Sequence, residues 1–542
     1  MPPCGDFHRQ DLGDAGLMNN EQDRRGTWVQ RIWWHIRDLY HQLKPCRFSF
    51  LVVLIACPVF LSVAQGTEIL RTVGEGMAIS GQWYWPRVCG FFAALILWAV
   101  CSWYSARVLL YFDSPGAYRG PSSKFAGTHI PRILGVAPIL IVACGFFVAS
   151  RSYDAGTSVW NWLIGFGIFS ALLAVIVYLL FIARRKWLRS GPRLEVRRIR
   201  DLPGGTLVGV GIIALISLAL FLAFTIRPVP IAQFMGMGTI LLLAASSWVA
   251  LGSFLVFLGL RWQFPVLTVV LLLACLFSLW NDNHVIRQVP ARAVKRAHLL
   301  QAFQTWYDGV EKNYGAGTMH PLYIVATEGG GIRAAYWTAI LLGEIQDRNP
   351  NFAPHLFAIS GVSGGSLGAT VFDALLAEPN RGSFKFKDKA HAILGRDFLS
   401  PTLAAMLYPD LAQRFIPFPI PYFDRGRALE MAWEKAWRDS MGNDRFSRSF
   451  VDLWPPDSRE WMPALFLNGT SVEKGNRIIA SNVHLTNNFL DAEDAADKLA
   501  GYKLPATEAA CHIPLSTAAH MSARFTFVSP AGHFPDGSRI VD

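Results

Sequence analysis

Seven long apolar runs within the first 280 residues constrain the fold of this chain more than any other feature. Each is near the roughly 20 residues that a helix needs to cross a hydrocarbon core of about 30 Å. Tryptophan and tyrosine crowd the ends of the runs, as in the aromatic belts of membrane interfaces. The runs are Phe48–Ala64, Val88–Phe112, Ile133–Ala149, Val159–Ala183, Leu207–Ile226, Gly238–Leu260 and Val266–Trp280. The sequence therefore predicts an α-helical transmembrane bundle of about seven helices over residues 48–280, with a count one higher or lower left open by the short first and last runs.

Residues 1–47 are polar and form a separate N-terminal region. Within it, Trp28–Leu43 carries apolar residues at helical spacing with arginines between them. This pattern fits an amphipathic helix at a membrane surface and equally an ordinary solvated helix.

The net charge of +11 would suit a nucleic-acid-binding protein, but the distribution of the basic residues gives another explanation. They cluster in the polar stretches beside the apolar runs. One cluster precedes the first run: Arg24, Arg25, Arg31, Arg37, Lys44 and Arg47. Another follows the fourth run: Arg184, Arg185, Lys186, Arg189, Arg193, Arg197, Arg198 and Arg200. The positive-inside rule then predicts a cytoplasmic N-terminus and no nucleic-acid partner.

The number of membrane crossings determines on which side of the membrane the C-terminal half lies. Seven crossings place it on the non-cytoplasmic side of the membrane, and one crossing more or fewer reverses this. A small basic cluster just past the last run favours the cytoplasmic side: Arg287, Arg292, Lys295 and Arg296. Residues 281–320 are predicted to be a polar connector between the two halves.

Two glycine-rich turns follow the connector, in Tyr323–Trp337 and Leu356–Gly368. Each is preceded by a short apolar strand and followed by a helical pattern. The second contains G-x-S-x-G, the nucleophile elbow, with Ser363 at its centre. A serine at such a strand-to-helix turn has a strained backbone. The positions of Gly361 and Gly365 are expected to require glycine, because side chains there would collide with each other across the turn. A lone G-x-S-x-G is often accidental, but the two turns together favour catalysis.

The first turn supplies hydrogen-bond donors that the elbow lacks. Gly329, Gly330 and Gly331 open a helix, so their amides can converge on one point, and Gly364 opens the helix after the elbow. Such amides are a ready oxyanion hole for acyl transfer. Arg333 is expected to hold this loop or to attract an anionic headgroup. A phosphate-binding loop is disfavoured because no Gly-Lys-Ser/Thr follows.

The pair Glu328-Gly-Gly-Gly-Ile-Arg333 and Ser360-Gly-Val-Ser-Gly-Gly-Ser366 resembles the patatin-like phospholipase family. The resemblance covers about residues 321–542. It implies an α/β hydrolase domain there, a Ser–Asp dyad without histidine, and an aspartate in a late D-G-G or D-G-A motif. Glu328 departs from the aspartate usual in the family, at a position that is not catalytic.

The resemblance points to Asp542 as the dyad base. Ser516–Ala523 resembles the helix before the last catalytic strand of the family. The stretch from Phe525 is expected to form a strand, a hairpin turn and a return strand ending at Asp542, so the natural chain is expected to continue with glycine and the domain to be incomplete here. Asp536, in Asp-Gly-Ser, is the rival base. The histidines that keep a Ser-His-Asp triad open are His355, His391, His484, His512, His520 and His533.

Together these features predict a membrane-anchored serine acyl hydrolase, phospholipase A-like, that acts on membrane lipids without cofactor or metal. The alternative is a membrane sensor or scaffold with a degenerate, lipid-binding hydrolase domain. Further strands are expected at Ala464–Asn468 and Arg477–Ser481. The Pro- and aromatic-rich stretch 380–457 is expected to be an irregular packed loop, or else a lid or bilayer-resting segment.

Overall fold

The computed structural model divides the chain into two compact units, which are described separately. The helical unit comprises Met1–Leu218 and Leu242–Leu271, and the mixed unit comprises Ala219–Leu241 and Leu272–Asp542. The structure describes residues 28–542 except 112–122, 188–203, 291–295, 316, 318, 456–460, 487–488, 490, 501–510 and 527.

Long apolar helices dominate the first half of the chain. Six of the described helical stretches are long and apolar enough to span a membrane, and these features indicate a membrane protein. The spans are Ile32–Leu61, Ala64–Leu110, Gly127–Ser150, Ser158–Ala183, Val208–Ile226 and Met237–Trp262. The seventh predicted segment forms the helix α11 (Val266–Phe277), whose 12 residues fall short of the usual spanning length.

The remaining helices of this half have the following bounds: α2 (Trp28–Leu43), α3 (Arg47–Leu61), α4 (Ala64–Ser80), α5 (Trp85–Tyr111), α6 (Ser123–Ser150), α7 (Ser158–Trp187), α8 (Gly204–Ile226), α9 (Pro228–Met235) and α10 (Met237–Trp262). The helix α4 was not predicted from the sequence; it carries charged residues between two apolar stretches.

Within the helical unit, small residues let α5, α6 and α7 approach closely. A Cβ added to Gly135 in α6 would lie 2.6 Å from Cβ of Trp103 in α5. The Trp103 ring in turn stacks on Phe181 of α7, with 4.4 Å between the ring centroids. Close backbone approach at small residues is the usual packing of membrane helices.

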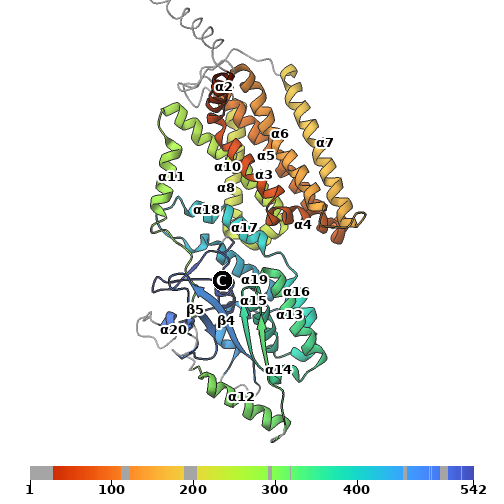
Figure 1. The fold of residues 1–542 in the computed structure, drawn as a ribbon, viewed down its shortest axis with the longest axis vertical. Helices are drawn as coiled ribbons and strands as arrows, with labels where there is room; N and C mark the ends of the chain where they lie inside the picture. The colour runs from red at the N-terminus through yellow and green to blue at the C-terminus, as the bar shows by residue number, and fades with distance from the viewer. Residues whose placement is uncertain are drawn as a thin grey trace, which may run out of the picture. The chain divides into compact units, whose positions relative to one another are not determined.

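A small mixed sheet organises the mixed unit (Figure 1). Its main path has the order β2-β3-β4-β5-β6, formed by β2 (Tyr323–Thr327), β3 (Leu356–Val362), β4 (Ala464–Ser471), β5 (Arg477–Ser481) and β6 (Glu493–Asp494). The strands β2, β3 and β4 are mutually parallel, whereas β5 is antiparallel to β4. The hairpin of β8 (Gly532–His533) and β9 (Arg539–Val541) joins β4 through antiparallel pairing of β9. A separate pair of strands joins β1 (Val289–Pro290) to β7 (Cys511–His512).

The hairpin strand β9 lies on the same side of β4 as β3. Thr470 of β4 pairs with both Arg477 of β5 and Val541 of β9, so these two strands flank β4 from opposite sides. The other neighbour of β4 is β3, which pairs with Ala464–Asn468 and ends at Val362. The strand β9 therefore occupies the position beside β4 that β3 leaves when the chain turns into a helix.

Strand side chains alternate between two hydrophobic layers, as the two-residue period of a strand requires. Leu465 and Leu467 of β4 join the core formed by α13 (Gly331–Arg348) and α15 (Gly364–Leu376). Phe466 faces the other way, into a cluster with Trp306 of α12 (Leu299–Tyr314). The sheet thus lies between two layers that contain helices, and every residue of α15 is buried.

The stretch 380–457, expected to be irregular, is mostly helical in the described part of the chain. It forms α16 (Phe386–Leu394), α17 (Leu399–Leu407), α18 (Pro409–Gln413) and α19 (Arg425–Met441). Trp433 and Trp437 of α19 are buried in the main core. The helix α21 (Leu515–Met521) forms where a late helix was expected, but the following hairpin strand starts only at Gly532 rather than at Phe525.

Candidate active site

Ser363 stands at the junction between β3 and α15 in a backbone conformation that side chains rarely adopt. Its φ is 55° and its ψ is −125°. It is one of three described non-glycine residues with positive φ. The side chain is nearly buried, with 9% relative exposure. Such strain at a strand-to-helix turn is the geometry of a nucleophile elbow.

The glycines around the turn have no room for side chains. A Cβ on Gly361 would lie 2.8 Å from Cα of Ser366, and one on Gly365 would lie 2.6 Å from the carbonyl oxygen of Glu328. Side chains at these two positions were expected to collide with each other. In the structure they would instead collide with Ser366 and with the end of β2. The glycines are needed because β2 and α15 pack directly against the turn.

The structure brings the glycine-rich loop to the elbow. Thr327, at the end of β2, pairs with Gly361 in the parallel register. A Cβ on Gly329 would lie 3.1 Å from Cβ of Ser363. Gly330 has φ of 144° and Gly331 φ of 61°, which favour glycine at both positions. The two turns thus meet at one end of neighbouring strands.

Two helix N-termini face this point. The helix α13 begins at Gly331 and α15 begins at Gly364. Their backbones are so close that a Cβ on Gly364 would lie 1.9 Å from the carbonyl oxygen of Gly331. The first amides of a helix have no partner within it and carry its positive dipole end, which suits them to bind an oxyanion. Arg333 lies in the first turn of α13 and is exposed.

Ser522, which sequence reasoning missed, holds the elbow from the C-terminal side. The amide of Ser363 donates to the carbonyl oxygen of Ser522 at 2.8 Å. The Ser522 and Ser366 hydroxyl oxygens are 2.7 Å apart, and the Ser522 hydroxyl also donates to the carbonyl oxygen of Asn468. The Asn468 side chain donates to the carbonyl oxygen of Gly361 at 2.8 Å. Asn468 therefore lies within β4 and braces the elbow.

Asp542 directly follows β9 and is tied to the same segment as Ser363. Its amide donates to the carbonyl oxygen of Arg524 at 3.1 Å, two residues beyond Ser522. Because β9 runs toward the end of β3 along one side of β4, the backbone of Asp542 approaches the elbow. No hydrogen bond joins the Ser363 hydroxyl to the Asp542 carboxylate, both of which lie in the described part of the chain. Asp536 lies in the hairpin turn, where it accepts hydrogen bonds from Ser538.

The described histidines bond to groups other than Ser363. His355 contacts the carbonyl oxygen of Asn351, His391 the Tyr336 hydroxyl, and His484 the ring of His298. The buried His520 lies between Glu430 and Ser529, and His533 pairs with Asp282. The side chain of His512 lies outside the described residues. These contacts give a Ser-His-Asp triad no support.

A buried ionic network anchors the segment that holds Ser363. Nδ1 of His520 is 2.9 Å from Glu430. Burial and the nearby Arg524 guanidinium lower the pKa of His520. Burial alone would raise the pKa of Glu430, but the hydrogen bond from His520 and neighbouring cations lower it to about 2. An ionised Glu430 and a neutral His520 therefore fix helix α21 just before Ser522.

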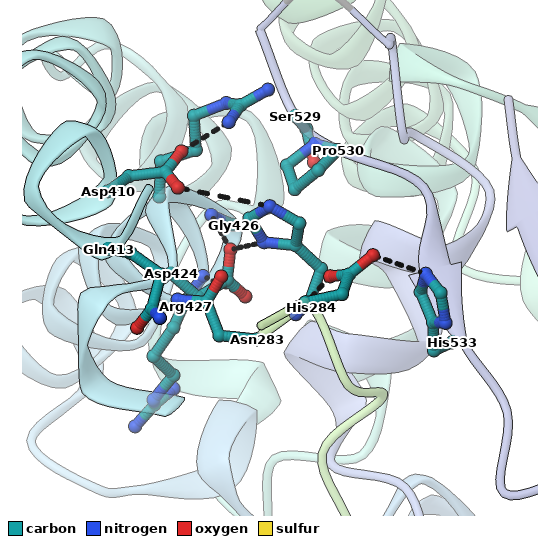
Figure 2. Close-up of polar contacts among 12 residues, drawn as sticks. Asn283, His284, Asp410, Gln413, Asp424, Gly426, Arg427, Ser529, Pro530 and His533 are labelled. Carbon is teal, nitrogen blue, oxygen red and sulfur yellow. Dashed lines mark hydrogen bonds and ion pairs between the residues drawn. The ribbon is translucent and has the colours of Figure 1, made fainter. Parts of the chain in front are cut away.

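The network continues around His284, as Figure 2 shows. Nδ1 of His284 is 2.8 Å from Asp424, and Nε2 is 3.9 Å from Asp410. Burial opposes ionisation of Asp424, but contacts from His284 and from the Arg524 charge hold its pKa below the usual value. Asp282 pairs with His533 at 2.8 Å. Residues just past α11, expected to be part of a polar connector, are thus built into the core of the mixed unit.

The described residues also bring His484, Asp494 and Asp497 together in a group that could hold a cation. The guanidinium of Arg296 donates to both aspartates, at 2.8 Å and 3.1 Å. The two carboxylates of this group are therefore already paired with the positive charge of Arg296.

Comparison of the chain with protein-family models, with curated proteins and with solved structures gave no match.

Proposed function

We propose that this protein is a membrane-anchored serine acyl hydrolase that cleaves lipid esters, with Ser363 as nucleophile and Asp542 as general base. The observation that carries the proposal is the meeting of the strained Ser363 turn with the glycine-rich loop, where a Cβ on Gly329 would lie 3.1 Å from Cβ of Ser363. A strained serine beside two helix N-termini is suited to attack on a carbonyl. The patatin-like resemblance of the same residues points to the same chemistry.

In the proposed reaction, the Asp542 carboxylate accepts the proton of the Ser363 hydroxyl as the oxygen attacks the ester carbonyl. The amides of Gly329, Gly330, Gly331 and Gly364 bind the oxyanion of the tetrahedral intermediate. Collapse of the intermediate expels the alcohol, which takes the proton from Asp542, and leaves an acyl-enzyme. Asp542 then activates a water that releases the fatty acid and restores the serine.

We propose that the catalytic half lies on the non-cytoplasmic side, reached by seven crossings that include α11. The support is the path of the chain through the mixed unit. Phe224, near the end of α8, packs on Tyr408, and Asn281, just past α11, donates to the carbonyl oxygen of Gln413. The chain leaves this unit through the 26 residues of α10 and returns to it through α11.

The return through α11 would be a short crossing. Helical hydrogen bonding continues past its end, because the amide of Asn281 donates to the carbonyl oxygen of Phe277 at 3.0 Å. A helix from Val266 to Asn281 would be about 24 Å long at about 1.5 Å per residue. Local thinning of the bilayer accommodates a helix of this length at modest cost. A protease added outside intact cells should cleave the catalytic half. If that half is protected from the protease, this topology is wrong.

The alternative is a lipid-binding sensor or scaffold that performs no hydrolysis. The observation that favours it is that no hydrogen bond joins Ser363 to Asp542 among the described residues. Catalytic hydrogen bonds are often long in the absence of substrate and tighten in the substrate complex, so a hydrolase has the same geometry in this state.

Labelling with a fluorophosphonate distinguishes the hydrolase from the sensor or scaffold, because the probe reacts only with an activated serine. We expect the full chain in membranes to be labelled, and we expect Ser363→Ala to abolish the label. Ser383→Ala is the matched control, since Ser383 is exposed in a short 3-10 turn and touches no part of the site. Labelling that survives Ser363→Ala would refute the nucleophile, and a chain that is never labelled would favour the sensor.

A further inference from the structure

We infer that the loop Phe415–Phe423, here called the aromatic loop, is a bilayer-contact surface that rests in the headgroup–acyl boundary of the membrane. The loop has the sequence Phe-Ile-Pro-Phe-Pro-Ile-Pro-Tyr-Phe and lies between α18 and α19. Three of its side chains are exposed despite their size: Phe415 by 45%, Phe418 by 60% and Tyr422 by 75%. Water is an unfavourable environment for such a cluster, so a covering partner is expected.

Contacts within the mixed unit tie the aromatic loop to the end of a membrane helix. The ring of Phe423 packs edge-on against Phe221 of α8, with 5.5 Å between the centroids. Phe221 belongs to the apolar span Val208–Ile226, one turn from its end. A loop in contact with this point lies at the depth where the span leaves the hydrocarbon core.

The end of a second apolar helix holds the loop from another side. Asn281, four residues past α11, donates from its side-chain amide to the carbonyl oxygens of Gln413 and Ile416, each at 2.9 Å. Asn283 donates likewise to Ile420 at 3.1 Å. Trp280, just before Asn281, is 51% exposed, and tryptophan is typical of the membrane interface. Two independent helix ends therefore place the loop at one boundary.

The backbone of the loop is suited to an apolar environment, because most of its polar groups are satisfied or absent. Three prolines, at positions 417, 419 and 421, carry no amide donor. The buried side chain of Gln413 donates to the carbonyl oxygen of Phe418 at 2.8 Å and accepts from the amide of Ile420 at 2.9 Å. Irregular backbone enters lipid only when its polar groups are paired in this way. A docking surface for water-exposed protein has no such requirement.

The loop also adjoins the segment that carries the candidate site. Arg425, two residues past the loop, donates to the carbonyl oxygen of Val528 at 3.0 Å. Val528 lies six residues from Ser522, whose carbonyl oxygen binds the amide of Ser363. If the proposed hydrolase function holds, the loop brings the site to substrates that stay in the bilayer rather than to dispersed esters.

Photocrosslinking tests the bilayer contact without relying on hydrolysis. Phe418 and, separately, Tyr422 are replaced by p-benzoylphenylalanine, a conservative change at exposed aromatic positions, and the full chain is reconstituted in phosphatidylcholine vesicles that contain a radiolabelled phosphatidylcholine. Tyr307 on α12, which is 39% exposed, is the matched control. We expect lipid adducts at both loop positions at about tenfold the yield at Tyr307. Equal yields at all three positions, or adducts between two protein chains in place of lipid, would overturn the inference.

A second measurement separates this inference from the proposed function. The double variant Phe418→Ser with Tyr422→Ser should lose most hydrolysis of vesicle phosphatidylcholine and keep hydrolysis of a soluble short-chain ester. Equal loss on both substrates, or no loss on either, counts against the loop as a bilayer contact. Lipid adducts from a chain that cleaves neither substrate would support the loop and refute the hydrolase.

Discussion

The amide of Ser363 donates to the carbonyl oxygen of Ser522 at 2.8 Å, across 159 residues of sequence. This bond joins the elbow to the segment after α21, and the carbonyl oxygen of Arg524 in the same segment accepts a hydrogen bond from the amide of Asp542. The proposed nucleophile and base are therefore positioned by one short stretch of chain. The buried pair of His520 and Glu430 holds that stretch in place.

Ser522→Ala should slow fluorophosphonate labelling about tenfold while leaving the protein folded. The variant keeps the carbonyl bond to Ser363 but loses the hydroxyl bonds to Ser366 and Asn468. A neutral hydrogen bond contributes about 1 kcal/mol, and about 1.4 kcal/mol corresponds to a tenfold rate. Ser383→Ala serves as the control, and an unchanged labelling rate in Ser522→Ala would show that the hydroxyl does not position the elbow.

Asp542→Asn should reduce ester hydrolysis by at least about 100-fold, since an amide cannot accept the serine proton and general bases contribute at least this factor. Asp536→Asn is the matched control, because Asp536 lies in the hairpin turn and bonds to Ser538. Initial rates on a short-chain ester measure both. The opposite pattern, with loss only in Asp536→Asn, would transfer the role of base to Asp536.

Gly365→Ala should abolish labelling and lower the unfolding temperature. Its Cβ would lie 2.6 Å from the carbonyl oxygen of Glu328, so the glycine-rich loop would have to move away from Ser363. Gly382→Ala should change neither property, because no atom lies within 4 Å of a Cβ built there. Thermal unfolding in detergent and probe labelling together check this prediction, which fails if both glycines tolerate alanine equally.

Asp373 should make the protein less stable as the pH rises. It is fully buried in α15, and burial raises its pKa well above the usual 3.8. Above pH 3.8 the unfolded chain releases this proton while the folded chain retains it. Stability therefore falls by about 1.4 kcal/mol per pH unit until the raised pKa is passed.

Asp373→Asn removes the ionisation and should flatten this dependence, so that the variant gains stability relative to the parent chain between pH 5 and pH 8. Asp388→Asn, at an exposed position in α16, is the control. Unfolding midpoints of the parent chain and both variants, measured from pH 5 to pH 8, test this prediction. A parallel decline in the parent and in Asp373→Asn would assign the effect to other groups.

The sequence predicted those parts of the fold whose signals are local. The short strands expected before the two glycine-rich turns form β2 and β3, and the helical patterns expected after them form α13 and α15. Trp28–Leu43 likewise forms α2. Glycine requirements and hydrophobic periodicity act within a few residues, so they can be read from one segment alone.

The parts that escaped prediction depend on contacts between distant segments. Proline and aromatic residues suggested an irregular stretch at 380–457, yet Trp433 and Trp437 pack a helix into the core. Nothing local to Ser522 or Asn468 marks them as supports of the elbow. The polar residues after α11 read as a connector because their partners, such as Asp424, lie more than a hundred positions away.

The strands β3 and β9 lie end to end along the same side of β4. The length of the hairpin between β8 and β9 therefore determines which way the residues of β9 face. Only Ile540 and Val541 of β9 pair with β4, so the register of β9 against β4 depends on two residue pairs. Successive residues of a strand face opposite sides of the sheet. Insertion or deletion of one residue between Phe534 and Ser538 that shifts the register of β9 by one would turn the side-chain carboxylate of Asp542 toward the far face of the sheet, so variation in length at this hairpin should be tolerated only in steps of two.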